Sequence, residues 1–207
     1  SATIETYSLC GSVSGPVFIL GVSLGGHIVF RVADQLRQKG FKVYPIVQGA
    51  PPKSFATKID EPLYEPRTDQ LRRALPLLAK DQFSDDEARL FVECQFTEKF
   101  IRENPAMIAE CIESAKKTKL RERFVGSLFD SDFDEMLAVK KHPQPWLFIH
   151  AKDDAGVNPK YLEHIPKDNF YRQNIHVLDG GHQLMPSNPE EFTALVIEYI
   201  KHCEALP

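Results

Sequence analysis

The stretch Pro16–Gly26, PVFILGVSLGG, decides how the first part of this 207-residue chain folds. It begins with a short apolar run between glycines, which is typical of a strand buried on both faces. From Leu24 to about Lys39 apolar residues recur every four positions, and Gly40 stands where a glycine commonly ends a helix. Residues 42–47 predict a second strand. A strand, a helix and a strand within about thirty residues make a βαβ unit, which favours a parallel sheet.

The junction between the first strand and the helix carries the pattern G-x-S-x-G, in Gly21–Gly26. This pattern describes a sharp turn that holds a serine in a strained conformation, and its glycines let the neighbouring backbones approach each other. The turn places the hydroxyl of Ser23 at the helix N-terminus, where the Leu24 N–H and the helix dipole can stabilise an oxyanion. We therefore predict that Ser23 is a nucleophile and that Leu24 supplies an oxyanion donor.

A serine hydroxyl is a poor nucleophile unless a base takes its proton, so the turn predicts a histidine late in the chain, after a strand. His182 meets this expectation. It follows the predicted strand 174–178 in a loop with two glycines, which leave room for an imidazole to reach the serine, and it precedes the last predicted helix. We predict that His182 is the base for Ser23.

The third group of such a site is a carboxylate that fixes the tautomer of the histidine. The strand predicted over residues 145–150 ends in two candidates, Asp153 and Asp154. We select Asp154 because its position resembles the one in which enzymes with this serine turn place their acid, at the end of a G-x-x-D loop whose glycine is Ala151 here. The order along the chain is then serine, aspartate, histidine. Asp153 is expected to be a solvated neighbour.

Residues from about 51 to 143 have a different character, with helical periods, frequent charges and no convincing strand. They predict a helical subdomain inserted into a single domain that spans residues 1–207. Within it, Leu71, Leu75 and Leu78 belong to one apolar stripe, and a capping box opens a helix that carries Phe91. If the insertion covers the site as a lid, then Leu71, Leu75 and Phe91 are candidate substrate-binding residues.

The composition argues against several other classes of protein. The net charge of −4 offers no basic surface for nucleic acid, and the longest apolar runs are far too short to span a membrane. Residues 1–15 lack a basic leader, so we expect a cytoplasmic protein. Neither the histidines nor the cysteines have metal-ligand spacing, so we expect no metal and no cofactor. The cysteines are expected to be reduced; they are Cys10, Cys94, Cys111 and Cys203.

The remaining histidines are expected to have structural positions. His27 lies in the first turn of the helix that follows Ser23; we expect it to be structural, and its nearness to the site leaves a functional role open. A strand position is expected for His150 and for His176. The other three are expected at the surface; they are His142, His164 and His202.

Three segments, Gly21–His27, Ala33–Gly40 and Tyr44–Pro52, resemble the thioesterase domains of fatty acid, polyketide and nonribosomal peptide synthesis. Those domains combine the serine turn, a glycine-terminated helix, a strand and a double-proline loop that leads into a helical lid. The closing stretch Gly180–Pro186 fits the same pattern. The resemblance implies an α/β-hydrolase fold, with a mostly parallel sheet flanked by helices. It also implies substrates carried on acyl carrier protein or coenzyme A.

Two features of the chain depart from that family. Many synthase-embedded thioesterase domains place the acid directly after the second strand, where Val47–Pro51 contains no carboxylate. This leaves Asp154, as in free-standing type II thioesterases. In addition, only about fifteen residues precede Pro16, so the first half of the sheet and one oxyanion donor are expected to be missing. A fragment, a processing product or a divergent domain would each explain this, and the exposed sheet edge favours a homodimer or a contact with a missing N-terminal segment.

The leading hypothesis is a thioesterase that works through an acyl-enzyme. The first alternative is a carboxylesterase or lipase-like hydrolase that uses the same three residues on an oxygen ester. The second alternative is a binding module that keeps the hydrolase-like fold without turnover. The residues of the site do not separate thioesters from oxygen esters.

Overall fold

The structure is a computed structural model, and it describes residues 15–53, 62–117 and 132–206. Its centre is a sheet of four strands in the order β1-β2-β3-β4, in which each neighbouring pair is parallel. The strands are β1 (Val17–Val22), β2 (Val43–Gln48), β3 (Trp146–Ala151) and β4 (Phe170–Leu178). The predicted parallel sheet is confirmed, and the predicted ends of β1, β2 and β3 differ from the observed ones by one or two residues.

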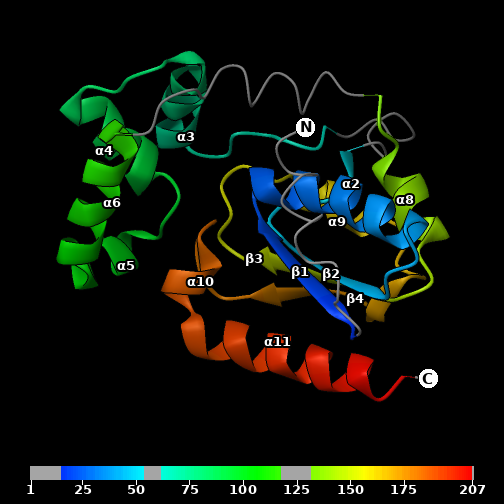
Figure 1. Ribbon diagram of the computed structural model, residues 1–207. Coiled ribbons are helices and arrows are strands. Elements are labelled where there is room, and N and C mark those ends of the chain that lie inside the picture. Colours follow the sequence, from blue (N-terminus) through cyan, green and yellow to red (C-terminus); the bar gives the residue numbers. More distant parts are fainter. Residues whose placement is uncertain (1–14, 54–61, 118–131, 207) are drawn as a thin grey trace.

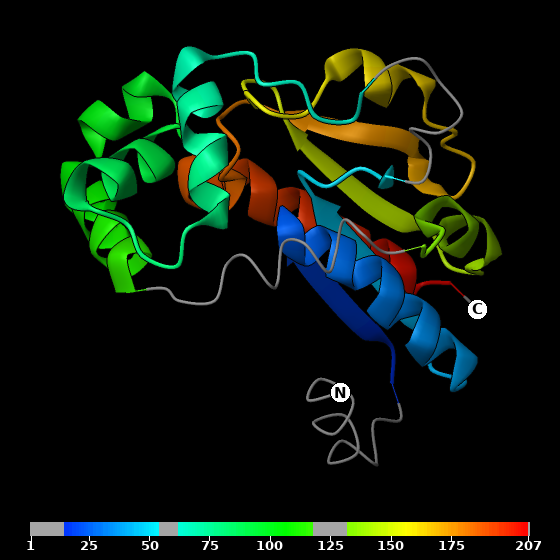
Figure 2. The same cartoon turned by 90° about the horizontal axis from the view of Figure 1, so that it is seen from above.

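Helices cover both faces of this sheet (Figure 1, Figure 2). One face carries α2 (Leu24–Gln38), α8 (Glu135–Lys141) and α9 (Pro159–His164), whose apolar residues share a buried cluster with the strands. The other face carries α11 (Pro189–Glu204), preceded by the short α10 (Leu184–Ser187). Every residue of β2 and β3 is buried. This explains why those strands are continuous apolar runs rather than alternating ones.

Local sequence signals set the ends of several helices. Lys39 follows the last residue of α2, and Gly40 then adopts a φ of +86° that a residue with a side chain rarely accepts. The start of α4 (Asp85–Glu93) is a capping box between Ser84 and Glu87. Both features agree with the sequence-based predictions.

A group of helices stands to one side of the sheet (Figure 1). It comprises α3 (Asp69–Ala74), a 3₁₀ turn (Leu75–Ala79), α4, α5 (Glu98–Glu103) and α6 (Pro105–Lys117), and it has an apolar cluster of its own. The interval 51–143 predicted to form the lid also contains α8. That helix packs against α2 and contributes to the buried cluster between the sheet and α2. Residues 54–61 and 118–131 of the interval lie outside the described residues.

The two outer strands differ in regularity. β1 pairs only with β2, and among the described residues no strand lies beyond it. At the opposite edge, the register between β3 and β4 shifts, and Arg172 and Gln173 have φ values of 54° and 52°. This irregularity explains why the sequence predicted only residues 174–178 as a strand. A homodimer or an N-terminal segment beside β1 stays a prediction.

Candidate active site

Ser23 occupies the sharp turn between β1 and α2. Its φ of 52° and ψ of −123° place it in a region that residues with side chains avoid, and such strain is typical of functional turns. The turn is held by a hydrogen bond from the Ser23 N–H to the Gln48 carbonyl oxygen, at 2.8 Å. Leu24 is the first residue of α2, so its N–H belongs to the first turn, whose N–H groups have no acceptor within the helix. The predicted positions of Ser23 and Leu24 therefore occur as expected.

Glycines are needed in this turn, although not at both of the predicted positions. A Cβ on Gly21 would lie 2.3 Å from the carbonyl oxygen of Gly25. A Cβ on Gly25 would meet no atom within 4 Å, so no side chain crowds that position. The crowded position is instead Gly26, where a Cβ would lie 2.5 Å from the Cβ of Ala50. The close approach is thus between α2 and the loop after β2.

His182 and Asp154 form a hydrogen-bonded pair, with 2.7 Å between Nδ1 and Oδ2. Asp154 lies in the loop after β3 and is 1% exposed. Its other oxygen accepts hydrogen bonds from the backbone N–H groups of Gly156 (2.8 Å) and Val157 (3.1 Å). The adjacent Asp153 is exposed. Of the two candidate carboxylates, Asp154 is therefore the one that contacts the histidine.

The contact between Asp154 and His182 shifts the pKa of both residues. Burial raises the pKa of Asp154, but the hydrogen bond and charge of His182 outweigh it and lower the pKa to about 2. For His182, burial lowers the pKa, and the hydrogen bond and charge of Asp154 outweigh this effect and raise it. An ionised Asp154 thus makes His182 a stronger base than a free histidine. With Nδ1 engaged by Asp154, Nε2 is the nitrogen that can accept a proton from a nucleophile.

The loop of His182 is held between β2 and the helical group. The side-chain amide of Gln48 donates to the His182 carbonyl oxygen at 2.9 Å. A Cβ on Gly181 would lie 2.8 Å from the Gln95 carbonyl oxygen and 2.9 Å from the Cα of Phe96. The glycine was expected to leave room for the imidazole. Its observed role is to let the backbone after α4 approach the loop.

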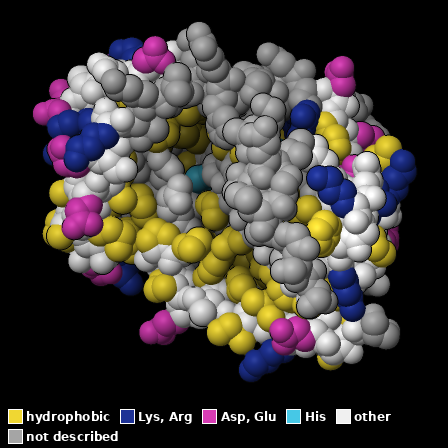
Figure 3. Space-filling model, in the orientation of Figure 1, with side chains coloured by type: hydrophobic (Ala, Val, Ile, Leu, Met, Phe, Trp, Pro, Cys, Tyr) yellow, Lys and Arg dark blue, Asp and Glu magenta, His cyan; other side chains and the backbone are white. Residues whose placement is uncertain are grey.

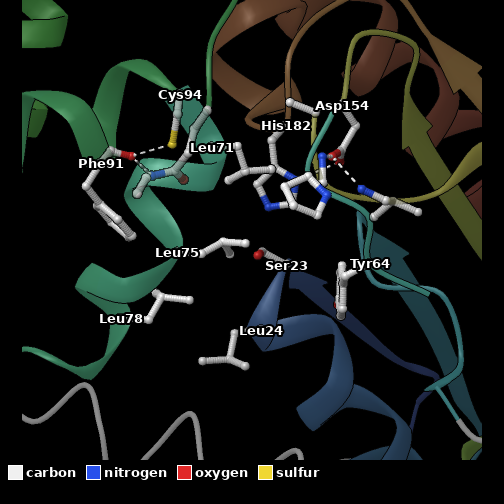
Figure 4. A pocket seen from close by; sticks show the side chains of 16 residues that line it. Ser23, Leu24, Tyr64, Leu71, Leu75, Leu78, Phe91, Cys94, Asp154 and His182 are labelled. Carbon is white, nitrogen blue, oxygen red and sulfur yellow. Dashed lines mark hydrogen bonds and ion pairs between the residues drawn. The ribbon is translucent and has the colours of Figure 1, made fainter. Parts of the chain in front are cut away.

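Ser23, Leu24, Asp154 and His182 line one cavity of about 210 Å³ (Figure 4). Figure 3 shows a hollow in the molecular surface, with hydrophobic side chains around it and a histidine visible inside. The three predicted substrate-binding residues line the same cavity; they are Leu71, Leu75 and Phe91. The structure therefore brings together every predicted site residue, from the turn, two loops and the helical group.

Several lining residues were not predicted to belong to the site; they are Tyr64, Pro66, Ala74, Leu78, Cys94, Gln95, Ala155, Gly156 and Val157. Leu78 belongs to the predicted apolar stripe of Leu71 and Leu75, although it was not selected as a candidate substrate-binding residue. No spacing rule identifies Tyr64. It reaches the cavity because its backbone forms an antiparallel bridge with Val157.

The other histidines separate into exposed and buried positions. His164 and His202 are exposed, as predicted. The prediction for His142 is wrong: it is 3% exposed and packs edge-on against Trp146, with ring centroids 5.4 Å apart. Its burial follows from the turn after α8, which folds the ring onto the start of β3. His27 is also buried and contacts Tyr64.

Neither a metal-binding cluster nor a membrane-spanning helix is found among the described residues. No group of three or more His, Cys, Asp or Glu side chains within residues 15–53, 62–117 and 132–206 is arranged to hold a metal ion. Among the helices of the same ranges, none has both the length and the apolar character that crossing a bilayer requires.

Comparisons with known proteins identify the fold. No protein-family model matches the chain and no curated protein does, whereas solved structures match closely. An N-acyl homoserine lactonase complexed with N-butanoyl homoserine has a TM-score of 0.74 at 19% identity, over 100% of this chain and 70% of its own. The chain has the α/β-hydrolase fold.

Two more proteins with the α/β-hydrolase fold extend this likeness. An esterase from Thermogutta terrifontis has a TM-score of 0.67 at 17% identity, over 98% of this chain and 70% of its own. The enol-lactonase from Burkholderia xenovorans LB400 has a TM-score of 0.66 at 13% identity, over 95% and 70%. The predicted fold class is confirmed. At these identities the likeness concerns the fold alone, and the thioesterase type stays a prediction.

Proposed function

We propose that the protein is a serine hydrolase that cleaves carboxylic esters with an apolar acyl group. The observation that carries this proposal is the hydrogen-bonded pair of His182 and Asp154, which shares an apolar cavity with the strained Ser23. A nucleophile, a base and a carboxylate that orients the base are the three groups that acyl transfer requires.

Each group has a defined step in the proposed reaction. The Ser23 hydroxyl oxygen attacks the ester carbonyl carbon while Nε2 of His182 takes the hydroxyl proton. The Leu24 N–H stabilises the negative oxygen of the tetrahedral intermediate. His182 then gives the proton to the departing alkoxide, which leaves as an alcohol. A water molecule, activated in turn by His182, hydrolyses the acyl-enzyme and frees Ser23.

The lining of the cavity favours a neutral substrate. Most of the described residues that line it are apolar, and none of these described residues is Lys or Arg. A carboxylate or phosphate on the part of the substrate that enters would therefore be desolvated without a compensating cation. The similar structures include an esterase and two lactonases by name, so oxygen esters are the first substrates that we propose to test.

A thioester on acyl carrier protein or coenzyme A is the second candidate substrate. The resemblance of Gly21–His27 and of the double proline Pro51–Pro52 to thioesterase domains favours it. In that case the acyl chain would occupy the cavity, and the phosphates of the carrier arm would stay outside it. The mechanism through Ser23 and His182 would be the same.

The experiment compares esters and thioesters that share one acid. The substrates are butanoyl esters of small alcohols, butanoyl thioesters of the matching thiols, and butanoyl-coenzyme A. Each is assayed separately, and Ser23→Ala is the blank. Faster turnover of the oxygen ester, abolished in Ser23→Ala, is the expected result. Faster turnover of the thioesters would support the second candidate. A wild-type protein that hydrolyses none of them would contradict the proposal and favour a binding module.

A further inference from the structure

A second histidine–carboxylate pair lies one helical turn from Ser23. Nδ1 of His27 on α2 is 3.0 Å from Oε1 of Glu135 on α8, and each side chain is 2% exposed. The other oxygen of Glu135 accepts the backbone N–H of Lys53. A buried carboxylate is costly to desolvate, so its presence beside the cavity calls for a role.

His27 also contacts the hydroxyl of Tyr64, which lies 2.8 Å from its Nε2. An ionised carboxylate only accepts hydrogen bonds, so the neutral ring places its proton on Nδ1 and leaves Nε2 as an acceptor. The Tyr64 hydroxyl then donates to Nε2. Burial, followed by the charges of Glu135 and Asp154, raises the pKa of Tyr64 well above its usual value. The hydroxyl therefore keeps the proton that it donates.

The backbone fixes Tyr64 on the same side of the cavity as Asp154. Tyr64 bridges Val157 in an antiparallel pairing, and the N–H of the next residue, Glu65, donates to the Gly156 carbonyl oxygen at 2.8 Å. The segment that contains Tyr64 and Glu65 thus runs along the loop that carries Asp154. Tyr64 is held at two points, by its backbone on this loop and by its hydroxyl on α2.

The two sides of the cavity are chemically different (Figure 4). In this view Tyr64 lies on the side of Asp154, and the side chains of Leu75, Leu78 and Phe91 lie on the other side of Ser23. The leaving group of an ester must approach the histidine that protonates it. The acyl and alcohol parts of an ester extend in different directions from the carbonyl carbon, so an acyl chain that packs on the leucines directs the alcohol to the other side of Ser23, towards Tyr64.

We propose that Tyr64 is a specificity-determining residue whose ring, anchored by His27 and Glu135, contacts the alcohol part of the ester. The inference rests on the proposed ester hydrolysis. It divides the cavity into an alcohol side, formed by Tyr64, and an acyl side, formed by the helical group. A flat aromatic alcohol can stack on the ring, so benzyl esters should be favoured over methyl esters of the same acid.

The experiment measures kcat and KM for methyl and benzyl esters of butanoic acid, and for methyl esters of acids from acetic to octanoic. Tyr64→Ala removes the ring, and Tyr64→Phe keeps the ring but removes its anchor. Leu75→Ala alters the opposite side. The matched control is Tyr44→Phe, which removes a buried hydroxyl that donates to the Cys203 carbonyl oxygen, outside the cavity.

Tyr64→Ala should lower the benzyl-to-methyl ratio of kcat/KM by about threefold to tenfold, mainly through KM. Tyr64→Phe should lower it by less, and both should keep the wild-type preference for acyl length. Leu75→Ala should show the reverse pattern, and Tyr44→Phe should change neither ratio. An unchanged benzyl-to-methyl ratio in Tyr64→Ala, or a change confined to acyl length, would overturn the inference while ester hydrolysis stands. Absence of ester turnover in the wild type would instead overturn the proposed function, and this inference with it.

Discussion

Replacing Asp154 with asparagine tests the role of the carboxylate by exchanging one oxygen for an amide nitrogen. Oδ1 of Asp154 accepts hydrogen bonds from the N–H groups of Gly156 (2.8 Å) and Val157 (3.1 Å). An asparagine keeps its oxygen at that position, because its NH₂ group cannot accept those bonds. The NH₂ group then faces Nδ1 of His182, where Oδ2 of Asp154 lies at 2.7 Å.

This exchange forces the wrong tautomer on His182. The amide nitrogen is a donor, so Nδ1 must become the acceptor and the ring proton moves to Nε2. The nitrogen that should take the proton of Ser23 then already carries one. We expect kcat to fall by about ten-thousand-fold, the size of effect seen when a triad aspartate is exchanged in this way. This corresponds to about 5 kcal/mol of transition-state stabilisation.

The assay is steady-state hydrolysis of a butanoyl ester, with thermal unfolding as a test that the variant is folded. Asp153→Asn is the matched control, because Asp153 is exposed next to Asp154, and it should retain wild-type kcat. A folded Asp154→Asn enzyme whose kcat stays within about tenfold of the wild type would refute the assigned role.

Other groups around the cavity lead to expectations in pH dependence, stability and thiol reactivity. Burial lowers the pKa of His182, but Asp154 raises it on balance, and the basic form is lost as the pH falls through that pKa. The acid limb of kcat/KM should therefore have its midpoint above about 6.5, and a midpoint at or below this value would contradict the account. Gly181→Ala should lower the free energy of unfolding in urea by about 1–3 kcal/mol, because its Cβ would press on the backbone after α4. Gly25→Ala is the control, because a Cβ at Gly25 would meet no atom within 4 Å. Equal stability of the two variants would refute the packing argument. Burial raises the pKa of the Cys94 thiol to about 11, so iodoacetamide at pH 7.5 should alkylate it at least about a hundredfold more slowly than free cysteine. Rapid labelling of the Cys94 peptide, seen by mass spectrometry, would show that the thiol is not shielded.

The positions of Ser23, Asp154 and His182 could be predicted because each follows from a local pattern. Ser23 sits in a glycine-rich turn between β1 and an amphipathic helix, and the other two follow β3 and β4. Parallel strands end at the same edge of a sheet, so three residues at strand ends come together without any knowledge of side-chain packing. The apolar stripe that contains Leu71 and Leu75 could also be predicted, because helical periodicity is a local pattern in the sequence.

The anchor of Tyr64 could not be predicted, because it depends on contacts between distant segments. His27 and Glu135 are 108 positions apart, and no periodicity links them. Each residue is unremarkable in its own helix, and only the packing of α8 on α2 brings them together. The same packing explains why α8 contributes to the core under the sheet, although helical periodicity alone grouped it with the predicted lid.

The requirement for glycine in the turn was only partly predictable. The pattern G-x-S-x-G identifies two glycines, and the structure shows crowding at Gly21 but open space at Gly25. The crowding at Gly26 depends on Ala50 in the loop after β2, a contact that the motif does not encode. A motif therefore locates the turn, whereas the steric reason for each glycine comes from the segment packed against it, which is α2 for Gly21 and the loop after β2 for Gly26.

The most direct test of the central claim is covalent labelling of Ser23 by an alkyl fluorophosphonate, followed by intact-protein and peptide mass spectrometry. A serine activated by His182 should react to one equivalent, with the adduct on the Ser23 peptide and no labelling in Ser23→Ala. Labelling should also slow sharply in Asp154→Asn. A folded wild-type protein that takes up no label, or takes it up on another residue, would contradict the assignment of Ser23 as an activated nucleophile.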